Sequence, residues 1–277
     1  MQKTIIFKFI QFYVLAFFLV LSMHGCGDPG SNHVSSRGVT TESISADMHV
    51  SSSDGEVVTV EAAIKEGTFA SGFYIDLAPE DIFMASVVGE PSSVRINDNL
   101  FENTSQLEEK YKRLTQGTRD VFGISQDGIW YYTTFGGTDE NTEITISLLR
   151  EQQNDAPRTI VKLPPAFEIL EPLAGQAFSR SSDAITVGWN QGSLGDVMRL
   201  KGFVSCLNNS NGVWSSPEIT DTGSYVINAG TFSGYTGSCS VSIGVERFRL
   251  GQLDPAFGNG GKIEAHQYRM VMIFTVE

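Results

Sequence analysis

Histidine, cysteine and basic residues are scarce in this chain. There are four His and three Cys among 277 residues, and 19 Lys and Arg stand against 32 Asp and Glu. So few cysteines exclude a small disulfide-rich scaffold. Nucleic-acid binding needs clustered Lys and Arg, and an acidic surface repels phosphate, so we expect no nucleic-acid partner. The acidity most simply keeps the protein soluble.

Catalytic motifs are also missing. The sequence has no His-Glu-x-x-His motif, no phosphate-binding loop and no Gly-x-Gly-x-x-Gly that opens a helix. The segment "GISQD" is not a serine-nucleophile elbow, because Asp127 stands where the second glycine belongs. His24 belongs to the N-terminal signal peptide that we predict, and His33 belongs to the tether that we predict after it. Of the two remaining histidines, His49 and His266, we expect His266 to be structural, and we predict no enzyme and no cofactor.

Candidate metal ligands are present but lack the spacing of a known site. The oxygen-bearing residues of two segments are Asn97, Asp98, Asn99 and Glu102, and Asp139, Glu140 and Glu143. Neither segment has the spacing of an EF-hand calcium loop. We therefore predict no metal site.

The N-terminus has the order of an export signal. Lys3 and Lys8 precede an uninterrupted apolar run from Phe9 to Leu21, and small residues follow. The run is short for a membrane span, which needs roughly 20 residues, although extending it back to Ile5 keeps an uncleaved anchor as the alternative. We predict that residues 1–25 form a cleaved signal peptide.

The apolar run closes with Met23, His24 and Gly25, directly before Cys26. This ending resembles the lipobox of bacterial lipoproteins, in which a short apolar and small-residue tripeptide precedes an invariant cysteine. The resemblance implies that Cys26 is acylated, with palmitate among the attached fatty acids. The lipid would then hold the protein at a bilayer. The residue after the cysteine is Gly27 rather than Asp, which resembles the pattern of lipoproteins that are sorted to the outer membrane. Ordinary signal-peptidase cleavage is the rival, although Met23 is bulky at position −3.

Residues 26–47 consist mostly of Gly, Ser, Thr, Pro and charged residues. A segment with so little apolar surface does not offset the entropy of ordering it. We predict a flexible tether over these residues, which lets the following domain stand off from the membrane.

If Cys26 carries lipid, Cys206 and Cys239 remain, and an exported protein with two cysteines tends to pair them. Cys206 alternates in phase with Val204, and Cys239 with Val241, so both side chains should face a core. We predict a disulfide that closes a loop of about 34 residues. Two buried free thiols are the alternative. A redox or metal site is not expected, because there is no CxxC spacing and no nearby His.

Alternating apolar residues predict an antiparallel β module over 48–158. The runs "VVTVEAAI", "GFYIDLA", "IWYYTTF" and "EITISLL" are separated by Gly, Asn and Asp. One short helix is predicted within this module, over residues 105–117. Ser105 can cap it, Glu108 completes a capping box and Gly117 can end it.

A second module is predicted over 159–277. Four of the nine prolines lie between residues 154 and 172, which marks a junction. A short strand, a Pro-Gly loop and a strand ending in Trp189 follow, and they resemble the opening of bacterial immunoglobulin-like and fibronectin-like modules. The resemblance implies an Ig-like β-sandwich. The fold class of the whole chain is therefore all-β, with two β-sandwich-like modules.

The strand that begins at Cys239 changes phase. Apolar residues alternate from Cys239 to Val245, but Phe248 and Leu250 have the opposite parity. We predict a β-bulge near Glu246, since an extra residue restores the phase.

Three aromatic residues are candidate ligand contacts. Trp130 and Tyr132 share one face of a predicted strand, with Tyr131 on the other, and one of these faces must belong to the core. Trp214 lies in the turn-like segment "NNSNGVWSSPE" and is expected to be exposed.

The layout of lipobox, tether and two β modules resembles uncharacterised lipoproteins of Gram-negative bacteria. The resemblance implies an envelope location and a fold. Our first hypothesis is a non-catalytic lipoprotein that contacts an envelope protein or glycan, and it predicts no cleft lined by convergent carboxylates or histidine. The alternative is a secreted carbohydrate-binding protein or a carboxylate-dependent hydrolase, since spacing in sequence cannot exclude two opposed carboxylates.

Overall fold

The computed structural model describes residues 33–52, 57–87, 111–121, 124–136, 140–192, 195–208 and 210–277. Within these ranges the chain forms strands β1 to β19 and two 3-10 helices of 3 residues each, η1 (Ser36–Gly38) and η2 (Thr41–Ser43). The all-β prediction is confirmed. No helix in the described ranges is long and apolar enough to cross a bilayer.

The first module is a sandwich of two sheets. One sheet contains β1 (His33–Ser35), β2 (Ile44–Ser52), β3 (Val57–Glu66), β4 (Phe73–Asp76), β7 (Thr115–Val121) and β8 (Ile124–Gly136). The other has the order β10 (Ala156–Lys162), β9 (Glu143–Leu149), β5 (Ile82–Ser86) and β6 (Tyr111–Arg113). Both sheets send buried apolar side chains into one core, among them Val60, Tyr131 and Ile146.

The second module is also a two-sheet sandwich. Its smaller sheet has the order β11 (Ile169–Glu171), β13 (Ile185–Trp189) and β17 (Ser224–Ile227). Its larger sheet has the order β15 (Asn211–Ser215), β14 (Val197–Cys206), β18 (Cys239–Leu250) and β19 (Gly261–Val276), with β16 (Ile219–Thr220) beside β14 and β12 (Ala177–Ser179) parallel to β19. Val187, Trp189 and Ile243 belong to the core between the sheets. Lettered along the chain, the sheets are A-B-E and C′-C-F-G, the arrangement of immunoglobulin-like and fibronectin-like sandwiches.

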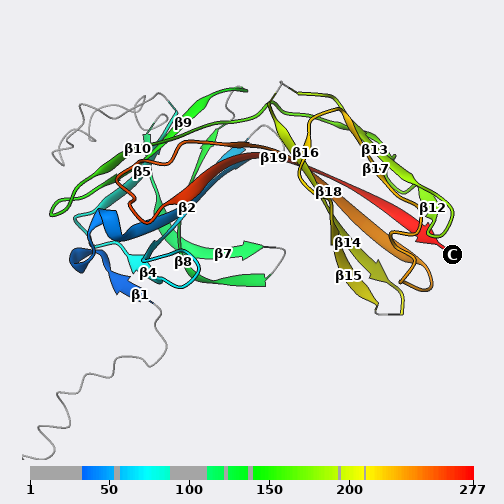
Figure 1. Cartoon of the computed structure of the whole chain (residues 1–277), viewed down its shortest axis with the longest axis horizontal. Coiled ribbons are helices and arrows are strands. Elements are labelled where there is room, and N and C mark those ends of the chain that lie inside the picture. Colours follow the sequence, from blue (N-terminus) through cyan, green and yellow to red (C-terminus); the bar gives the residue numbers. More distant parts are fainter. Residues whose placement is uncertain are drawn as a thin grey trace, which may run out of the picture. The chain divides into compact units, whose positions relative to one another are not determined.

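Strand β19 belongs to both modules (Figure 1). Its first half pairs with β2 in parallel, and Ile263 lies in the first core. Its second half pairs with β18, and Ile273 lies in the second core. The predicted boundary between residues 158 and 159 falls inside β10, which belongs to the first module. A strand of 16 residues exceeds the length of a usual strand, so one element serves two sandwiches.

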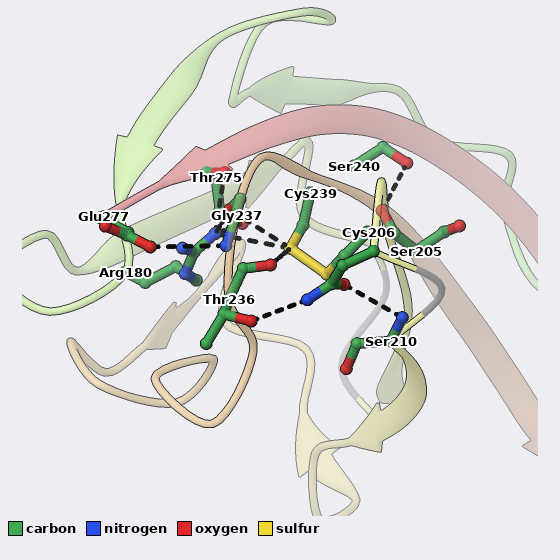
Figure 2. The surroundings of a disulfide bond; sticks show 11 residues. Arg180, Ser205, Cys206, Ser210, Thr236, Gly237, Cys239, Ser240, Thr275 and Glu277 are labelled. Carbon is green, nitrogen blue, oxygen red and sulfur yellow. Dashed lines mark hydrogen bonds between the residues drawn. A yellow bond between two sulfur atoms is a disulfide. The ribbon is translucent and has the colours of Figure 1, made fainter.

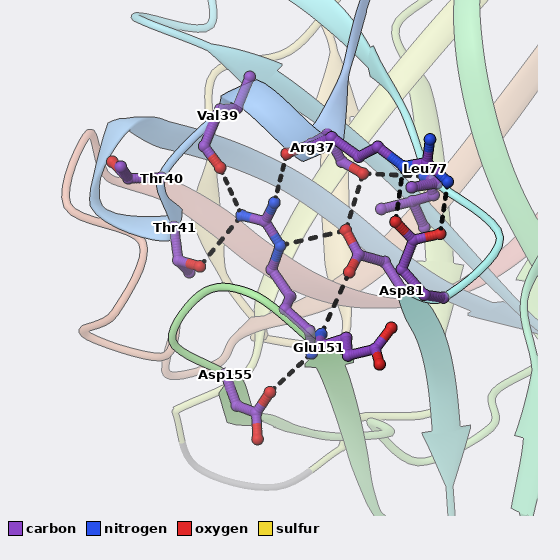
Figure 3. A network of polar contacts seen from close by, with 12 residues as sticks. Arg37, Val39, Thr40, Thr41, Leu77, Asp81, Glu151 and Asp155 are labelled. Carbon is purple, nitrogen blue, oxygen red and sulfur yellow. Dashed lines mark hydrogen bonds and ion pairs between the residues drawn. The ribbon is translucent and has the colours of Figure 1, made fainter.

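The prediction of a tether over residues 26–47 is wrong from His33 onward, where β1, η1, η2 and the start of β2 follow one another. Ser36 and Thr41 are buried there. The guanidinium of Arg150 donates to the Ser36 carbonyl over 2.5 Å and to the Thr41 hydroxyl over 3.2 Å (Figure 3). A buried cation orders this polar segment by satisfying its oxygens, which the composition of the segment does not reveal.

The predicted helix over residues 105–117 is also wrong in its second half, where β6 and β7 are found. Residues 105–110 lie outside the described ranges. Leu114 is buried in the first core. Gly117 does not end a helix: a Cβ there would lie 2.3 Å from a ring carbon of Tyr132, so glycine makes room for that ring. Pairing with distant strands outweighs a local capping pattern.

The predicted bulge near Glu246 is absent, because β18 pairs with β14 and with β19 without a shift of register. The inward phase continues from Val245 to Arg247, which is fully buried. Phe248 lies on the opposite face and stacks on His266, with 6.0 Å between ring centroids. The phase change in the sequence therefore reflects a charged residue in the core and a phenylalanine outside it.

Candidate functional site

Ionisable side chains gather on the face of the long sheet that is turned away from the first core. They are Asp47 and His49 of β2, Glu264 and His266 of β19, and Glu246 of β18, which we call the histidine cluster. Their neighbours Met48, Val50, Ile263 and Ala265 alternate with them and are buried in the core. Since successive side chains of a strand point to opposite faces, the polar set must lie on the other face.

Strand pairing brings the two halves of the histidine cluster together. Residues 49 and 264 are direct partners in the parallel pair of β2 and β19. Glu264 and His266 are two residues apart on one strand and so share a face. The cluster therefore rests on paired backbone of the sheet and not on loops.

His266 is the centre of the cluster. Its Nδ1 atom lies 2.8 Å from Oε1 of Glu246, and its Nε2 atom lies 3.4 Å from Oε2 of Glu264. The same Nε2 atom lies 3.4 Å from Nδ1 of His49. The other ring nitrogen of His49, Nε2, lies 3.3 Å from Oδ1 of Asp47. Each imidazole thus has a carboxylate at one nitrogen and faces the other imidazole with its second nitrogen.

The pKa values of the cluster are shifted by these contacts. Burial alone would raise the pKa of Glu246, but contact with His266 and nearby basic side chains outweighs burial and lowers it to about 2. For Glu264, contact with His266 is the main cause of a pKa of about 2, against burial and with help from Lys262. Burial would lower the pKa of His266, yet the two glutamates outweigh it and raise that pKa. Both glutamates are therefore anionic at neutral pH and attract a cation to the cluster.

Aromatic rings border the cluster. Phe248 stacks on His266, and the Trp130 ring lies 6.5 Å from that of His49. The guanidinium of Arg199 lies over the Phe248 ring at 4.9 Å, and its Nε donates to Glu246 over 2.8 Å. These groups shield the cluster from water, which strengthens its electrostatic interactions.

The three aromatic residues predicted as ligand contacts do not form one platform. Trp130 is only 6% exposed, whereas Tyr132 is 43% exposed. Trp214 is not in an exposed turn: it lies on β15, where its ring packs against Tyr225 and Phe232. Most of the Trp130 and Trp214 rings therefore serves packing.

The cysteines at positions 206 and 239 form the predicted disulfide, with 2.05 Å between sulfurs (Figure 2). They are direct partners at the ends of β14 and β18. Arg180 lies beside the bond and donates to the carbonyls of Gly237 and Thr275 over 2.6 and 3.0 Å. The disulfide joins neighbouring strands of one sheet, unlike the bridge between sheets in antibody domains.

The outer face of the larger sheet of the second module carries exposed apolar side chains, which we call the apolar row. They are Phe203 of β14, Val213 of β15, and Met270, Met272 and Phe274 of β19, each between 44% and 81% exposed. Residue 203 is the direct partner of residue 213, and Ser242 of β18 pairs with both residue 203 and residue 272. The row therefore has members on β15, β14 and β19, and Ser242 of β18 lies between Phe203 and Met272.

Several predicted residues lie outside the described ranges. They are Cys26, the segment with Asn97, Asp98, Asn99 and Glu102, and Asp139. The histidine cluster, in contrast, was missed by sequence reasoning. Its members come from three strands, and its two histidines are 217 positions apart. Their one signal in the sequence is polar residues in the outward phase of apolar strands.

No protein-family model matches this sequence, and no curated protein sequence does. Among solved structures, a chain of a cytokine receptor complex aligns with a TM-score of 0.25 and 11% identity over 83% of this chain and 94% of its own length. The mouse nectin-like molecule 4 ectodomain aligns with a TM-score of 0.23 and 7% identity over 84% of this chain, which spans 64% of that ectodomain. By its own strand order, the protein is an all-β chain whose second module is an immunoglobulin-like β-sandwich.

Proposed function

We propose that this protein is a non-catalytic lipoprotein, anchored by lipid in the outer membrane of the bacterial envelope, that binds a protein partner through the apolar row. The apolar row is the observation that carries the binding role. Groups of exposed apolar side chains on one face of a soluble protein mark interaction sites. Two of the five members are methionines, whose flexible side chains adapt to a partner surface.

The chemistry of the row favours a protein over a glycan. Val, Met and Phe side chains offer no hydrogen-bond donors, which a sugar requires alongside an aromatic face. Trp214, the aromatic residue nearest to this role in the sequence, is packed against Tyr225 and Phe232. A partner with its own apolar side chains fits the row better.

The histidine cluster supports a non-catalytic role for its glutamates. Hydrolysis by paired carboxylates needs one acid with a raised pKa that donates a proton. Glu246 and Glu264 both have pKa values lowered to about 2. Neither is suited to act as a general acid near neutral pH.

Lipidation at Cys26 places the fold close to a bilayer. Cys26 lies seven positions before His33, where β1 begins. Even a fully extended chain of that length reaches only about 25 Å. The first module is therefore held near the membrane surface, because the ordered chain begins earlier than the composition suggests.

The anchor is tested by Cys26→Ser with labelled palmitate and membrane fractionation. We expect the wild-type chain to carry label and to sediment with membranes, and the variant to lose both. Unchanged membrane association without label in the wild type contradicts the proposed anchor.

The binding surface is tested by site-specific photocrosslinking in the native envelope. A photoreactive residue at position 213 or 270 is expected to yield one discrete protein adduct, and the same residue at Leu173, which is 72% exposed outside the row, is the matched control. Phe203→Asp together with Met272→Asp should abolish the adduct without changing the fold. Equal adducts at all three positions, or an adduct that survives the double substitution, contradict the proposal.

A further inference from the structure

We propose that His49, Glu264 and His266 bind a divalent transition metal ion of the zinc class. One ligand atom from each residue lies within 4.8 Å of the other two. This inference rests on the histidine cluster and is independent of the proposed binding role of the apolar row.

The spacing of the ligand atoms suits a tetrahedral ion. Nε2 of His266 lies 3.4 Å from Nδ1 of His49 and 3.4 Å from Oε2 of Glu264. Two atoms bound at about 2.0 to 2.1 Å to a tetrahedral zinc ion are about 3.4 Å apart. Two of the three distances therefore match a tetrahedral ion, and the third, between the ligand atoms of His49 and Glu264, is at most 4.8 Å.

Each histidine also has a carboxylate at ion-pair distance from the ring nitrogen that is turned away from the shared position. Glu246 lies 2.8 Å from Nδ1 of His266, and Asp47 lies 3.3 Å from Nε2 of His49. A carboxylate in this position orients the ring and directs the other nitrogen at the metal. In both residues that other nitrogen is the one that faces the shared position.

The remaining oxygen of Glu264 has a partner of its own. Oε1 lies 3.1 Å from the ammonium group of Lys262, which leaves Oε2 for the ion. The ligand set is thus two imidazole nitrogens and one carboxylate oxygen. Such a set suits zinc and its neighbours, whereas calcium and magnesium prefer oxygen ligands alone.

Three protein ligands leave a fourth position of the tetrahedron open. Zinc sites of this kind bind water or an external group in that position. The side chain of His49 is 16% exposed, compared with 8% for His266. We infer a site that exchanges its metal and takes an external ligand.

The test uses the full chain in detergent, stripped of metal with a chelator and titrated with Zn²⁺ against a chromophoric competitor. Binding of one equivalent is expected, together with a higher melting temperature, since a ligand that binds the folded state stabilises it. Co²⁺ should give the visible bands of a tetrahedral complex, and excess Ca²⁺ or Mg²⁺ should not displace Zn²⁺.

Variants localise the site. His49→Asn and His266→Ala should each abolish stoichiometric binding, and Glu246→Gln should weaken it about 10- to 100-fold through the orientation of His266. His33→Ala, which removes an exposed histidine on β1, is the control and should bind as the wild type does. If His266→Ala fails to fold, His49→Asn provides the test, because the side chain of His49 is partly exposed. Absence of stoichiometric Zn²⁺ binding, or wild-type binding by His49→Asn, overturns the proposal.

Discussion

Arg247 and Asp221 form an ion pair inside the second module, with 2.9 Å between Nη2 and Oδ2 and both side chains 1% exposed. Asp221 also accepts a hydrogen bond from Nε1 of Trp189 over 2.7 Å. Arg247 donates to the carbonyls of Pro165 and Asn190 over 3.0 and 2.6 Å. The pair thus ties β18 to the segment before β11 and to the end of β13.

Arg247→Met is expected to lower the free energy of unfolding by about 3 to 5 kcal/mol, because it leaves Asp221 as an unpaired buried charge. Adding Asp221→Asn should recover part of the loss, since Asn removes the charge and keeps an acceptor for Trp189. Urea unfolding of the single and double variants measures both effects. Lys201→Met is the control, because the side chain of Lys201 is 59% exposed. An equal loss of stability in Lys201→Met and Arg247→Met contradicts the prediction.

Arg150→Met is expected to release the N-terminal segment of the first module. The guanidinium lies 3.3 Å from Asp81 and donates to the Val39 carbonyl over 2.8 Å (Figure 3). Loss of the guanidinium leaves buried oxygens without a hydrogen-bond donor. Amide hydrogen exchange should therefore accelerate in β1, η1 and η2. Arg37→Met removes an exposed pair with Glu80 and should leave the exchange rates close to those of the wild type. Unchanged exchange in Arg150→Met would count against this role.

Removal of the disulfide by Cys206→Ala with Cys239→Ala is expected to lower the free energy of unfolding by at most about 4 kcal/mol, through the entropy of the unfolded chain. Reductant should lower the unfolding midpoint of the wild type and leave that of the double variant unchanged. Mass spectrometry of the unreduced chain checks that the bond is present. A wild-type midpoint that does not respond to reductant would argue that the bond adds no stability.

The buried hydroxyl of Tyr131 leads us to expect a loss of stability at alkaline pH. Its hydroxyl donates to the Ile75 carbonyl over 3.0 Å and accepts from the Leu77 amide over 2.9 Å. Burial raises its pKa to about 12, against a contribution from the Leu77 hydrogen bond. An unfolded tyrosine has a pKa of about 10, so the stabilising contribution is complete below about pH 10 and is lost as the pH rises to about 12.

Tyr131→Phe is therefore expected to flatten the alkaline part of the stability curve. It should also lower stability at neutral pH by about 1 to 3 kcal/mol, because two backbone groups lose their partner. Urea unfolding at a series of pH values measures both. Tyr132→Phe, at the exposed neighbouring position, should retain the wild-type profile, and an unaltered profile in Tyr131→Phe would refute the assignment.

Periodicity in the sequence identified most strands because alternation follows directly from the geometry of the pleated sheet. The runs around Val60, Ile146 and Ile243 all have their apolar faces in the cores. The same rule failed at Arg247, since it assigns charged residues to the outside. Asp221 and the carbonyls of Pro165 and Asn190 stabilise the buried arginine there, and all three come from distant parts of the chain.

The histidine cluster escaped prediction for a different reason. His49 and His266 are 217 positions apart, and the sequence does not state which strands are neighbours. Parallel pairing of β2 with β19 brings them together, and this pairing depends on a strand long enough to serve two sandwiches. Local patterns contain no information about such a pairing.

By itself, the sequence determined the all-β class and the phase of Cys206 and Cys239 toward a core, because each follows from local pattern or composition. The tertiary structure alone decided that residues 33–47 are folded, that Tyr111–Arg113 and Thr115–Val121 are strands, and that five ionisable side chains meet on one face. Each of these outcomes depends on partners far away in the chain. Long-range pairing and buried charge compensation outweigh the local preferences that sequence patterns report.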